Sequence, residues 1–337
     1  MKALFLFSKM LPSTRLRMVD CFDAYRAAGI ECTVRMIPPG PIGRLSALYA
    51  ASSHDLVVLQ KKTSLRRGEL ALLKRCNPRI IFDFDDAVMF HEQEHRKPLT
   101  GKPFLKFVRT INHCATAVAG NRFLAAFAEA NCPRVYVLPT PIDVDRYPLK
   151  DYGRPAETVT VGWLGAGGNL HFVRALAGVV QRLAKECPAV RFKIVSNQSI
   201  EIPGVPILFE PWSLEGEIAA LQSFDIGIMP LPDSVWARGK CGYKILQYMG
   251  VGVPAVASPV GINTEFIQPG VTGFLADGES EWVEHLRFLI DHPNERREMG
   301  LNGRAVVEAR YSKTRFAQRY IEVLRETAGS DTRGRRP

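Results

Sequence analysis

The sequence predicts an α/β protein with two domains, each built around an open parallel β-sheet. Three observations support this prediction. The chain has 337 residues, which is more than a domain with one hydrophobic core usually contains and close to the length of two domains. Short apolar runs alternate with longer amphipathic stretches, which is the pattern of repeated βαβ units. A break at Pro139-Thr140-Pro141, followed by a linker from Tyr147 to Pro155, separates two such series.

The first series contains short apolar strands and one clear helix. The helix is predicted over residues 15–28 and ends at Gly29, because glycine commonly terminates helices. The expected strands cover residues 4–7, 32–36, 55–59, 79–84, 116–119 and 135–138.

The alternation restarts with a strand over 159–164 and continues through 192–195, 226–229 and 254–257. An amphipathic helix over 313–326 follows, and a disordered tail is expected at 329–337. We therefore predict domains over 1–150 and 151–310, a C-terminal helix over 311–328, and the tail. Both halves are Rossmann-like. Because such sheets bind ligands beyond the carboxyl ends of their strands, we expect the two edges to face each other across a cleft.

The composition is that of a globular protein with a basic surface. The formal net charge is +10, which favours anionic partners such as nucleotides, diphosphates or acidic lipid headgroups, although a generically basic surface is the alternative. Binding to nucleic acid would rest on net charge alone and is not expected. The 7 cysteines are scattered without a C-x-x-C pair, which indicates reduced thiols in a cytoplasmic protein. With no apolar run long enough for a membrane span, any membrane contact would be peripheral, at the inner face.

A glycine-rich segment opens the second series. The strand 159–164 leads into Gly165, Ala166, Gly167, Gly168 and Asn169, and then into a helix. Glycines let a backbone approach a phosphate, and a helix N-terminus supplies N–H donors and partial positive charge. The segment is not a full G-x-G-x-x-G fingerprint. Its next strand ends in Ser196 and Asn197, which offer no acidic partner for a ribose. A tight turn between strand and helix is the alternative.

The second candidate segment covers residues 238–250. As one helix, it would present Lys240, Lys244 and Gln247 on the same face, at i, i+4 and i+7. Two lysines at a helix start, with Arg238 beside them, suit a diphosphate, and an amide one turn further suits a ribose. A solvated basic helix start is the alternative.

Acidic and basic residues follow the strands of the first series. Asp83, Asp85 and Asp86 lie at the end of the strand 79–84 and could orient a sugar, hold a metal, or cap the next helix. Arg15 and Arg17 follow the first strand and either face a ligand or begin a solvated helix.

Three other features have competing interpretations. Trp212 is expected either to line a base pocket or to pack in the core. Glu265 is expected at the start of a helix that faces the cleft, and whether it binds sugar stays open. His91-Glu92-Gln93-Glu94-His95 matches the H-E-x-x-H zinc protease motif. Pro98 and Pro103 shorten any helix there, so we interpret it as a polar loop.

Together these segments resemble the retaining glycosyltransferases of the GT-B fold, family 4, over nearly the whole chain. The strongest stretch runs from Gly239 to Phe274. The segment 162–168 is similar to the family's donor-side loop, and 83–86 matches an acceptor-domain position that is often His. Tyr311-Ser312 and the final helix resemble the segment that crosses back onto the first domain.

Three positions depart from the family pattern. The family's two framing glutamates correspond to Gly239 and Gln247, and its basic residue after the glycine loop to Ala166. The first strand is followed by Pro12-Ser13-Thr14-Arg15 instead of a glycine pair.

The resemblance implies transfer of a sugar from a nucleoside-diphosphate sugar to an acceptor hydroxyl, with retained configuration and no metal or other cofactor. The acceptor would be a glycan, a lipid-linked molecule or a small molecule, in one reading within cell-envelope glycan synthesis. A non-catalytic nucleotide-binding or scaffold protein and a nucleotide-sugar epimerase are the alternatives. The predicted catalytic residues are Lys240, Lys244 and Asp85; the donor-binding residues are Gly165, Ala166, Gly167, Gly168, Asn169, Ser196, Asn197, Trp212, Arg238, Gln247 and Glu265; and the acceptor-side residues are Arg15, Arg17 and Asp86.

Overall fold

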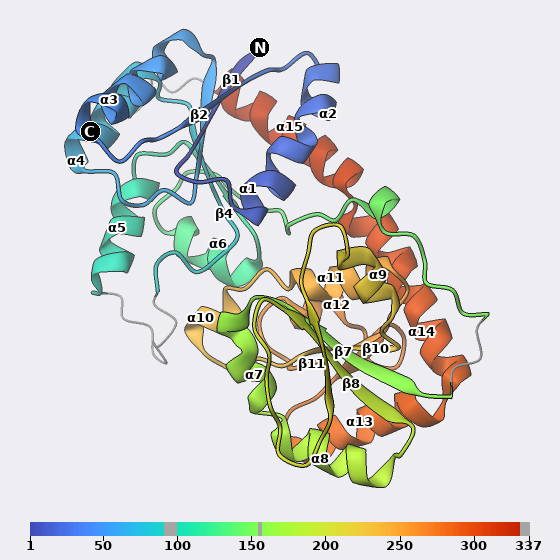
Figure 1. Ribbon diagram of the computed structural model, residues 1–337. Coiled ribbons are helices and arrows are strands. Elements are labelled where there is room, and N and C mark those ends of the chain that lie inside the picture. Colours follow the sequence, from blue (N-terminus) through green and yellow to red (C-terminus); the bar gives the residue numbers. More distant parts are fainter. Residues whose placement is uncertain (91–99, 154–156, 331–337) are drawn as a thin grey trace. The chain divides into compact units, whose positions relative to one another are not determined.

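The computed structural model describes residues 1–90, 100–153 and 157–330. The chain forms two compact units, each with its own six-stranded sheet (Figure 1). The first unit comprises Met1–Pro141, Ser234–Cys241 and the C-terminal segment from Lys313, and the second comprises Ile142–Asp233 and Gly242–Ser312. Residues 331–337 of the predicted tail lie outside the described residues.

The first unit contains a parallel sheet with the strand order β2-β1-β3-β4-β5-β6. Side chains of β1 alternate between two cores, with Leu4 and Leu6 on one face and Ala3 and Phe5 on the other. Because both faces are buried, the inner strands appear in the sequence as continuous apolar runs. The strands are β1 (Lys2–Phe7), β2 (Glu31–Met36), β3 (Leu56–Gln60), β4 (Ile80–Phe84), β5 (Thr116–Ala119) and β6 (Val135–Val137).

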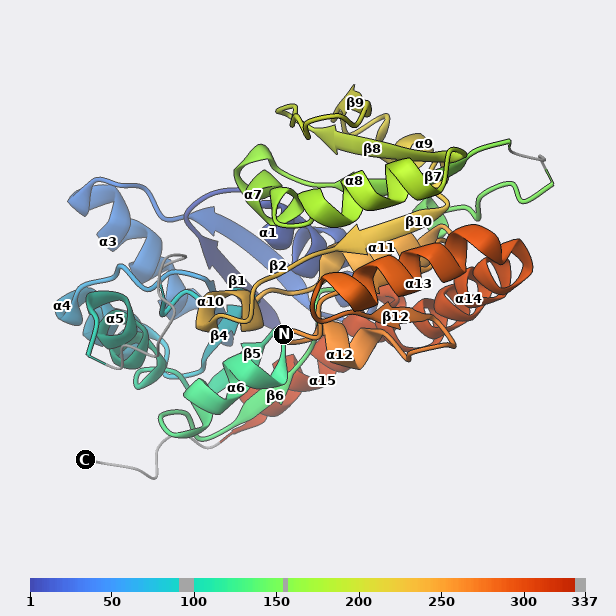
Figure 2. The ribbon, with the colours of Figure 1, turned by 90° about the horizontal axis from the view of Figure 1, so that it is seen from below.

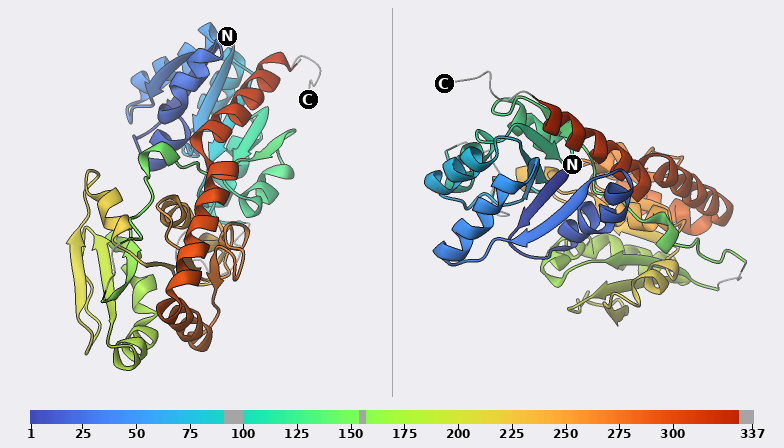
Figure 3. Two further views of the ribbon diagram at one scale, coloured as in Figure 1. Left: turned by 90° about the vertical axis from the view of Figure 1, so that its right-hand side faces the viewer. Right: turned by 90° about the horizontal axis from the view of Figure 1, so that it is seen from above.

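Helices cover both faces of this sheet. One face carries α2 (Phe22–Ala27) and the C-terminal helix α15 (Lys313–Gly329), which lie side by side (Figure 3). The other face carries α3 (Pro41–Tyr49), α4 (Arg67–Cys76), α5 (Lys102–Ile111), α6 (Arg122–Glu129) and α10 (Val235–Arg238).

The prediction of one helix over residues 15–28 is wrong. The segment folds as α1 (Pro12–Arg17), a 3-10 turn η1 (Val19–Cys21) and α2. Met18, which is fully buried, leaves the helical region at φ −120° and ψ −72°. Packing of Met18 into the core therefore overrides the helical periodicity of this segment.

The second unit contains a parallel sheet with the order β12-β11-β10-β7-β8-β9. Two of its strands were not predicted: β9 (Ile207–Pro211) is an edge strand with exposed apolar residues, and β12 (Gly273–Leu275) is only 3 residues long. The other strands are β7 (Val159–Leu164), β8 (Val190–Ser196), β10 (Ile226–Met229) and β11 (Ala255–Ala257).

The helices of the second unit also lie on both faces. One core joins Val161 and Trp163 of β7 to α7 (Leu170–Arg174), α8 (Ala177–Glu186) and α13 (Glu279–Asp291). Helix α11 (Tyr243–Gly250) packs closely on β10, because a Cβ at Gly227 would lie 2.4 Å from the ring of Tyr248. The remaining helices are α9 (Glu217–Gln222), α12 (Asn263–Phe266) and α14 (Pro293–Val306), and α14 contacts α13 (Figure 2).

Strand connectivity reverses between β1 and β3 in the first sheet and between β7 and β10 in the second. Ligands of open α/β sheets bind outside the carboxyl ends of the strands at such reversals, which directs attention to the segments after β7 and β3. All 7 cysteines are free thiols. Among the described residues, none of the helices is long and apolar enough to cross a bilayer.

Candidate functional site

The glycine loop and Lys244 come together at the carboxyl end of β7. A Cβ at Gly165 would lie 2.6 Å from Cε of Lys244 and 2.8 Å from the indole of Trp163. The Lys244 ammonium lies 5.3 Å from the centroid of that indole, whose residue is 1% exposed. Only a residue without a side chain at position 165 therefore leaves Lys244 its place beside the loop. The loop and Lys244, which belong to separate candidate segments of the sequence, thus lie side by side within the second unit.

Only some of the loop N–H groups are available to a ligand. The N–H of Gly165 donates to Val195 O, and the N–H of Gly167 donates to Oδ1 of Asn197 at 2.7 Å. The N–H groups of Ala166 and Gly168 donate to no described residue, and both residues are exposed. Two donors and one ammonium thus gather at the strand reversal, an arrangement suited to a phosphate group.

Asn197, Ser196 and Asn169 support the loop. Asn197 holds it through Gly167, and Asn169 donates its N–H to Ala166 O. Ser196 is fully buried, and its carbonyl accepts the N–H of Trp212 at 3.0 Å. The three residues are therefore placed to shape the loop at the end of β7 and β8.

Gln247 and Trp212 belong to one hydrogen-bonded chain. Gln247, 4% exposed, donates from Nε2 to the hydroxyl of Tyr147 at 3.3 Å, and that hydroxyl donates to Oε1 of Glu217 at 2.9 Å. The indole N–H of Trp212 donates to Oε2 of the same carboxylate at 3.0 Å. Burial, together with the charge of Glu217, raises the pKa of Tyr147 to about 12. Sequence reasoning missed Glu217, because no local motif marks it.

Lys240 and Lys244 do not share a helix, so that prediction is wrong. Helix α10 ends at Arg238, and α11 begins at Tyr243 after Gly242, whose φ of +61° lies in the left-handed region. A Cβ at Gly242 would lie 2.8 Å from Ile262 and 2.9 Å from Phe266, so tertiary packing adds to the need for glycine at this break.

Lys240 belongs to the first unit, whereas Lys244 belongs to the second. The ammonium of Lys240 lies 3.8 Å from the centroid of the Trp236 ring. The side-chain amide of Asn121 donates to the carbonyls of Arg238 and Lys240 at 3.2 and 3.1 Å, which attaches this segment to the N-terminus of α6.

Arg17 is part of the core of the first unit. Its guanidinium donates from Nε and Nη2 to the two carboxylate oxygens of Asp83 at 2.9 and 2.7 Å, and both side chains are 0% exposed. Its Nη1 donates to Leu138 O at 2.7 Å, and the hydroxyl of Tyr320 in α15 donates to Asp83 at 3.4 Å. Arg17 was predicted on the acceptor side, but its donors are already bonded to Asp83 and to Leu138 O. Arg15 is partly exposed and lies 3.9 Å from Asp20.

Lys61, at the carboxyl end of β3, joins the other two aspartates. Its ammonium lies 2.5 Å from Oδ1 of Asp85 and forms a second ion pair with Asp86. Asp85 is 1% exposed and also accepts the hydroxyl of Thr140, whereas the side chain of Asp86 is 54% exposed. Lys61 has φ +49°, the single positive value for a non-glycine among the described residues. Such strain persists where the surroundings impose it, often at functional sites.

The electrostatics separate the two aspartates. Burial alone would raise the pKa of Asp85, but Lys61 and then Arg17 outweigh it and lower that pKa. Desolvation and the neighbouring Asp85 carboxylate raise the pKa of Asp86. Asp86 is therefore the accessible carboxylate. Sequence reasoning assigned no role to Lys61, although its place directly after a buried strand was a usable signal.

Two predicted features remain to be placed, Glu265 and the H-E-x-x-H segment. Glu265 is exposed on α12. The H-E-x-x-H segment, 91–95, lies outside the described residues. Within the described ranges, no three His, Cys, Asp or Glu side chains are grouped to bind a metal ion.

Comparison with known proteins identifies the part of the chain that carries the glycine loop and Lys244. Residues 158–292, which contain all strands of the second sheet, match the family described as Glycosyl transferases group 1. This segment is similar to the domains of that family. An 88-residue stretch is 31% identical to trehalose synthase of Pyrococcus horikoshii, covering 26% of this chain and 21% of that protein. The chain thus matches about a fifth of the length of that curated relative.

Solved structures resemble nearly the whole chain. HepE of Anabaena in complex with UDP has a TM-score of 0.72 at 16% identity, over 97% of this chain and 100% of that one. Sucrose-phosphate synthase from Thermosynechococcus elongatus has a TM-score of 0.72 at 13% identity, over 97% and 99%. At these identities the likeness establishes the fold, and the protein has the GT-B fold with two Rossmann-like domains.

Two of the three departures within the matched segment, those at Gly239 and Gln247, have structural counterparts. A Cβ at Gly239 would lie 2.6 Å from Cβ of Ala87, so no glutamate side chain fits at that position. Gln247 is buried against Tyr147, where Glu217 already supplies a carboxylate. The carboxylate near Gln247 thus comes from Glu217 at the start of α9, which Gln247 reaches through Tyr147.

Proposed function

We propose that the protein is a retaining glycosyltransferase that moves a sugar from a nucleoside-diphosphate sugar to an acceptor hydroxyl. The observation that carries this proposal is Lys244 beside the glycine loop at the strand reversal of the segment that matches the group 1 glycosyl transferases. Structures of HepE with UDP and with UDP-glucose support a uridine diphosphate sugar as the first donor to test.

Lys244 would act on the leaving group. The bond between the anomeric carbon and the diphosphate oxygen breaks as negative charge accumulates on the diphosphate. The ammonium of Lys244 and the N–H groups of Ala166 and Gly168 would stabilise that charge. The acceptor oxygen would bond to the same face of the sugar, and its proton would pass to the departing phosphate oxygen. No protein base is then needed. The role predicted for Lys240 stays a prediction.

On the first unit, Asp86 is our candidate for orienting the acceptor or the transferred sugar. Its exposed carboxylate and its ion pair with Lys61 support this choice, whereas Asp85 is buried beneath them. We also infer metal-independent transfer, because each of the three aspartates already has a cationic partner, Arg17 for Asp83 and Lys61 for Asp85 and Asp86. Turnover should then be unchanged in excess EDTA.

A basic groove on the first unit supports contact with an anionic membrane, and with it a lipid-linked acceptor in cell-envelope glycan synthesis. The groove, of about 740 Å³, lies between α4 and α5, and its lining contains no carboxylate. Arg67, Lys102, Lys106 and Arg109 contribute charge, and Leu105, which is 56% exposed, contributes apolar surface.

Vesicle sedimentation tests this contact. Vesicles containing phosphatidylglycerol should bind the full chain, and those of phosphatidylcholine alone should not. Lys102→Glu with Lys106→Glu should reduce binding, whereas Lys185→Glu on α8 should not. Equal sedimentation of all three proteins would contradict it.

Turnover of a panel of nucleotide sugars tests the activity. Lys244→Ala should lower turnover about 100- to 1,000-fold, the usual effect of losing one transition-state donor. Lys185→Ala, an exposed lysine on α8 of the same unit, is the matched control and should leave turnover unchanged.

Three results would contradict the proposed function. Normal turnover of Lys244→Ala removes its mechanism. Nucleotide binding without turnover of any donor favours a scaffold protein. Interconversion of donors without an acceptor favours an epimerase.

A further inference from the structure

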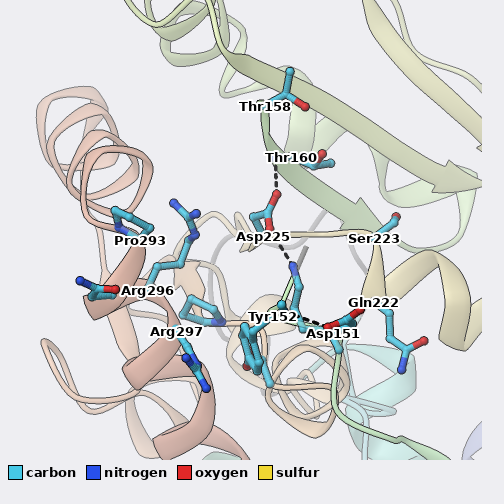
Figure 4. Close-up of a pocket in the computed structure, with 15 residues that line it drawn as sticks. Asp151, Tyr152, Thr158, Thr160, Gln222, Ser223, Asp225, Pro293, Arg296 and Arg297 are labelled. Carbon is cyan, nitrogen blue, oxygen red and sulfur yellow. Dashed lines mark hydrogen bonds and ion pairs between the residues drawn. The ribbon is translucent and has the colours of Figure 1, made fainter. Parts of the chain in front are cut away.

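A second pocket lies in the second unit, at the edge of the sheet opposite the glycine loop. It has a volume of about 650 Å³ and is lined by residues at the amino ends of β7 and β10, including Thr160 and Asp225 (Figure 4). The glycine loop follows the carboxyl end of β7, so a six-residue strand separates the two places. This pocket is not part of the proposed donor site.

One ion pair in the pocket is complete by itself. The ammonium of Lys150 lies 2.7 Å from Oδ1 of Asp225 and donates to Phe224 O at 2.5 Å. The other carboxylate oxygen of Asp225 accepts the N–H of Thr160 at 2.8 Å (Figure 4). Lys150 and Asp225 therefore neutralise each other in one wall of the pocket, and neither contributes much net charge to a ligand.

Two arginines on α14 line the pocket without an acidic partner. The guanidinium of Arg296 donates to the carbonyls of Leu289 and Ile290 at 2.5 and 3.2 Å. Arg297 lies over the ring of Tyr152, with 5.3 Å between its Cζ and the ring centroid. Within the described ranges, neither guanidinium has a carboxylate within ion-pair distance. Burial lowers the pKa of Arg296, and the charge of Asp225 offsets only part of this.

The remaining lining contains one further carboxylate, Asp151, and is otherwise neutral and partly hydroxylated. The side chains of Thr158 and Thr160 line the pocket at the amino end of β7 (Figure 4), and no described residue bonds to either hydroxyl. Tyr152 is held in place by a hydrogen bond from its hydroxyl to Gly252 O. The lining thus combines three cationic and two anionic side chains, a net charge of one positive unit, with hydroxyl groups that can donate and accept.

We propose that this pocket binds a small phosphorylated molecule rich in hydroxyl groups, of the sugar phosphate class. The phosphate would pair with Arg296 and Arg297, since planar guanidinium groups suit bidentate phosphate contacts. The hydroxyl groups of the ligand would bond to Thr158 and Thr160. The site would be additional to the donor site, and its occupancy does not depend on the transfer reaction.

Calorimetric titration of the full chain tests this site, with glucose 6-phosphate, inorganic phosphate and glucose as probes. Glucose 6-phosphate should bind more tightly than inorganic phosphate, and glucose should not bind. Arg297→Gln should weaken binding of glucose 6-phosphate at least about tenfold, because a charged hydrogen-bonded contact is lost. Arg297 is exposed, so this variant should fold. Arg191→Gln is the matched control, since Arg191 is exposed and also donates to backbone carbonyls.

A second comparison separates this pocket from the donor site. Lys244→Ala and saturating UDP should both leave the affinity for glucose 6-phosphate unchanged. Loss of binding in either case would place the ligand at the donor site and overturn the proposal. Absence of binding, equal affinity for inorganic phosphate, or unchanged affinity in Arg297→Gln would also overturn it.

Discussion

Replacing Gly165 with alanine should displace Lys244 without removing its charge. The new Cβ would lie 2.6 Å from Cε of Lys244 and 2.8 Å from the Trp163 ring. Comfortable carbon contacts begin near 3.5 Å, so both contacts must be relieved, and the one with Lys244 requires a shift of about 1 Å. Trp163 is 1% exposed and packed in the core, whereas the lysine side chain ends beside the loop. The lysine will therefore be the group that moves.

A shift of about 1 Å in a catalytic group can lower activity up to about a hundredfold, so kcat/KM of Gly165→Ala should fall about 10- to 100-fold. Crowding against Trp163 should also cost about 1 kcal/mol of stability. Steady-state turnover of the best donor and urea denaturation measure the two effects. The affinity for UDP, measured by calorimetry, should fall together with kcat/KM.

Gly168→Ala is the matched control, because no atom lies within 4 Å of its added Cβ. It changes the same loop by the same group and keeps every N–H donor. Its kcat/KM is the baseline that includes any effect of an added methyl group on phosphate approach, and its stability should change by less than about 0.5 kcal/mol. If folded Gly165→Ala kept kcat/KM within about threefold of Gly168→Ala, the placement of Lys244 would not matter and the reasoning would fail.

Three further predictions concern buried polar groups. Arg17→Met should destabilise the protein by about 3–5 kcal/mol in urea denaturation, because it leaves the carboxylate of Asp83 buried and unpaired; a loss under about 1 kcal/mol would argue against this. The pKa of Asp85 is lowered on folding, so its stabilising contribution is full above the unfolded pKa of about 3.9 and disappears as pH falls through the folded pKa. Asp85→Asn should therefore show a smaller loss of stability between about pH 5 and pH 2, and an unchanged slope would refute this. Tyr248→Phe should cost about 1–3 kcal/mol, since the buried hydroxyl bonds to backbone groups of β7 and β10, whereas Tyr49→Phe, 66% exposed, should cost almost nothing.

The sequence predicted the sheets best where strands are buried on both faces. Residues 4–7 and 80–84 are continuous apolar runs because helices cover both sides of β1 and β4. It missed β9 because Leu208 and Phe209 of this edge strand are exposed, at 50% and 42%, and the strand has no clear alternation. It missed β12 because so short a strand carries no pattern.

The candidate site divides in the same way. The glycine loop and Lys244 were found because each follows a recognisable local pattern, a strand leading into glycines or a cation at a helix start. The helical spacing of Lys240 and Lys244 was misleading, because the left-handed turn at Gly242 is required by packing against Ile262 and Phe266. Lys61 and Glu217 could not be assigned roles, since their partners are distant along the chain.

By itself the sequence determined the α/β class, the two parallel sheets and the loop at the end of β7. These depend on hydrophobic patterning and on the backbone freedom of glycine, which act over a few neighbouring residues. Only the tertiary structure decided that Arg17 neutralises Asp83, that Lys61 joins Asp85 to Asp86, and that Arg296 and Arg297 line a pocket without a described carboxylate at ion-pair distance. The physical reason is that charge pairing depends on distance in space, and the fold brings together groups that no local pattern connects.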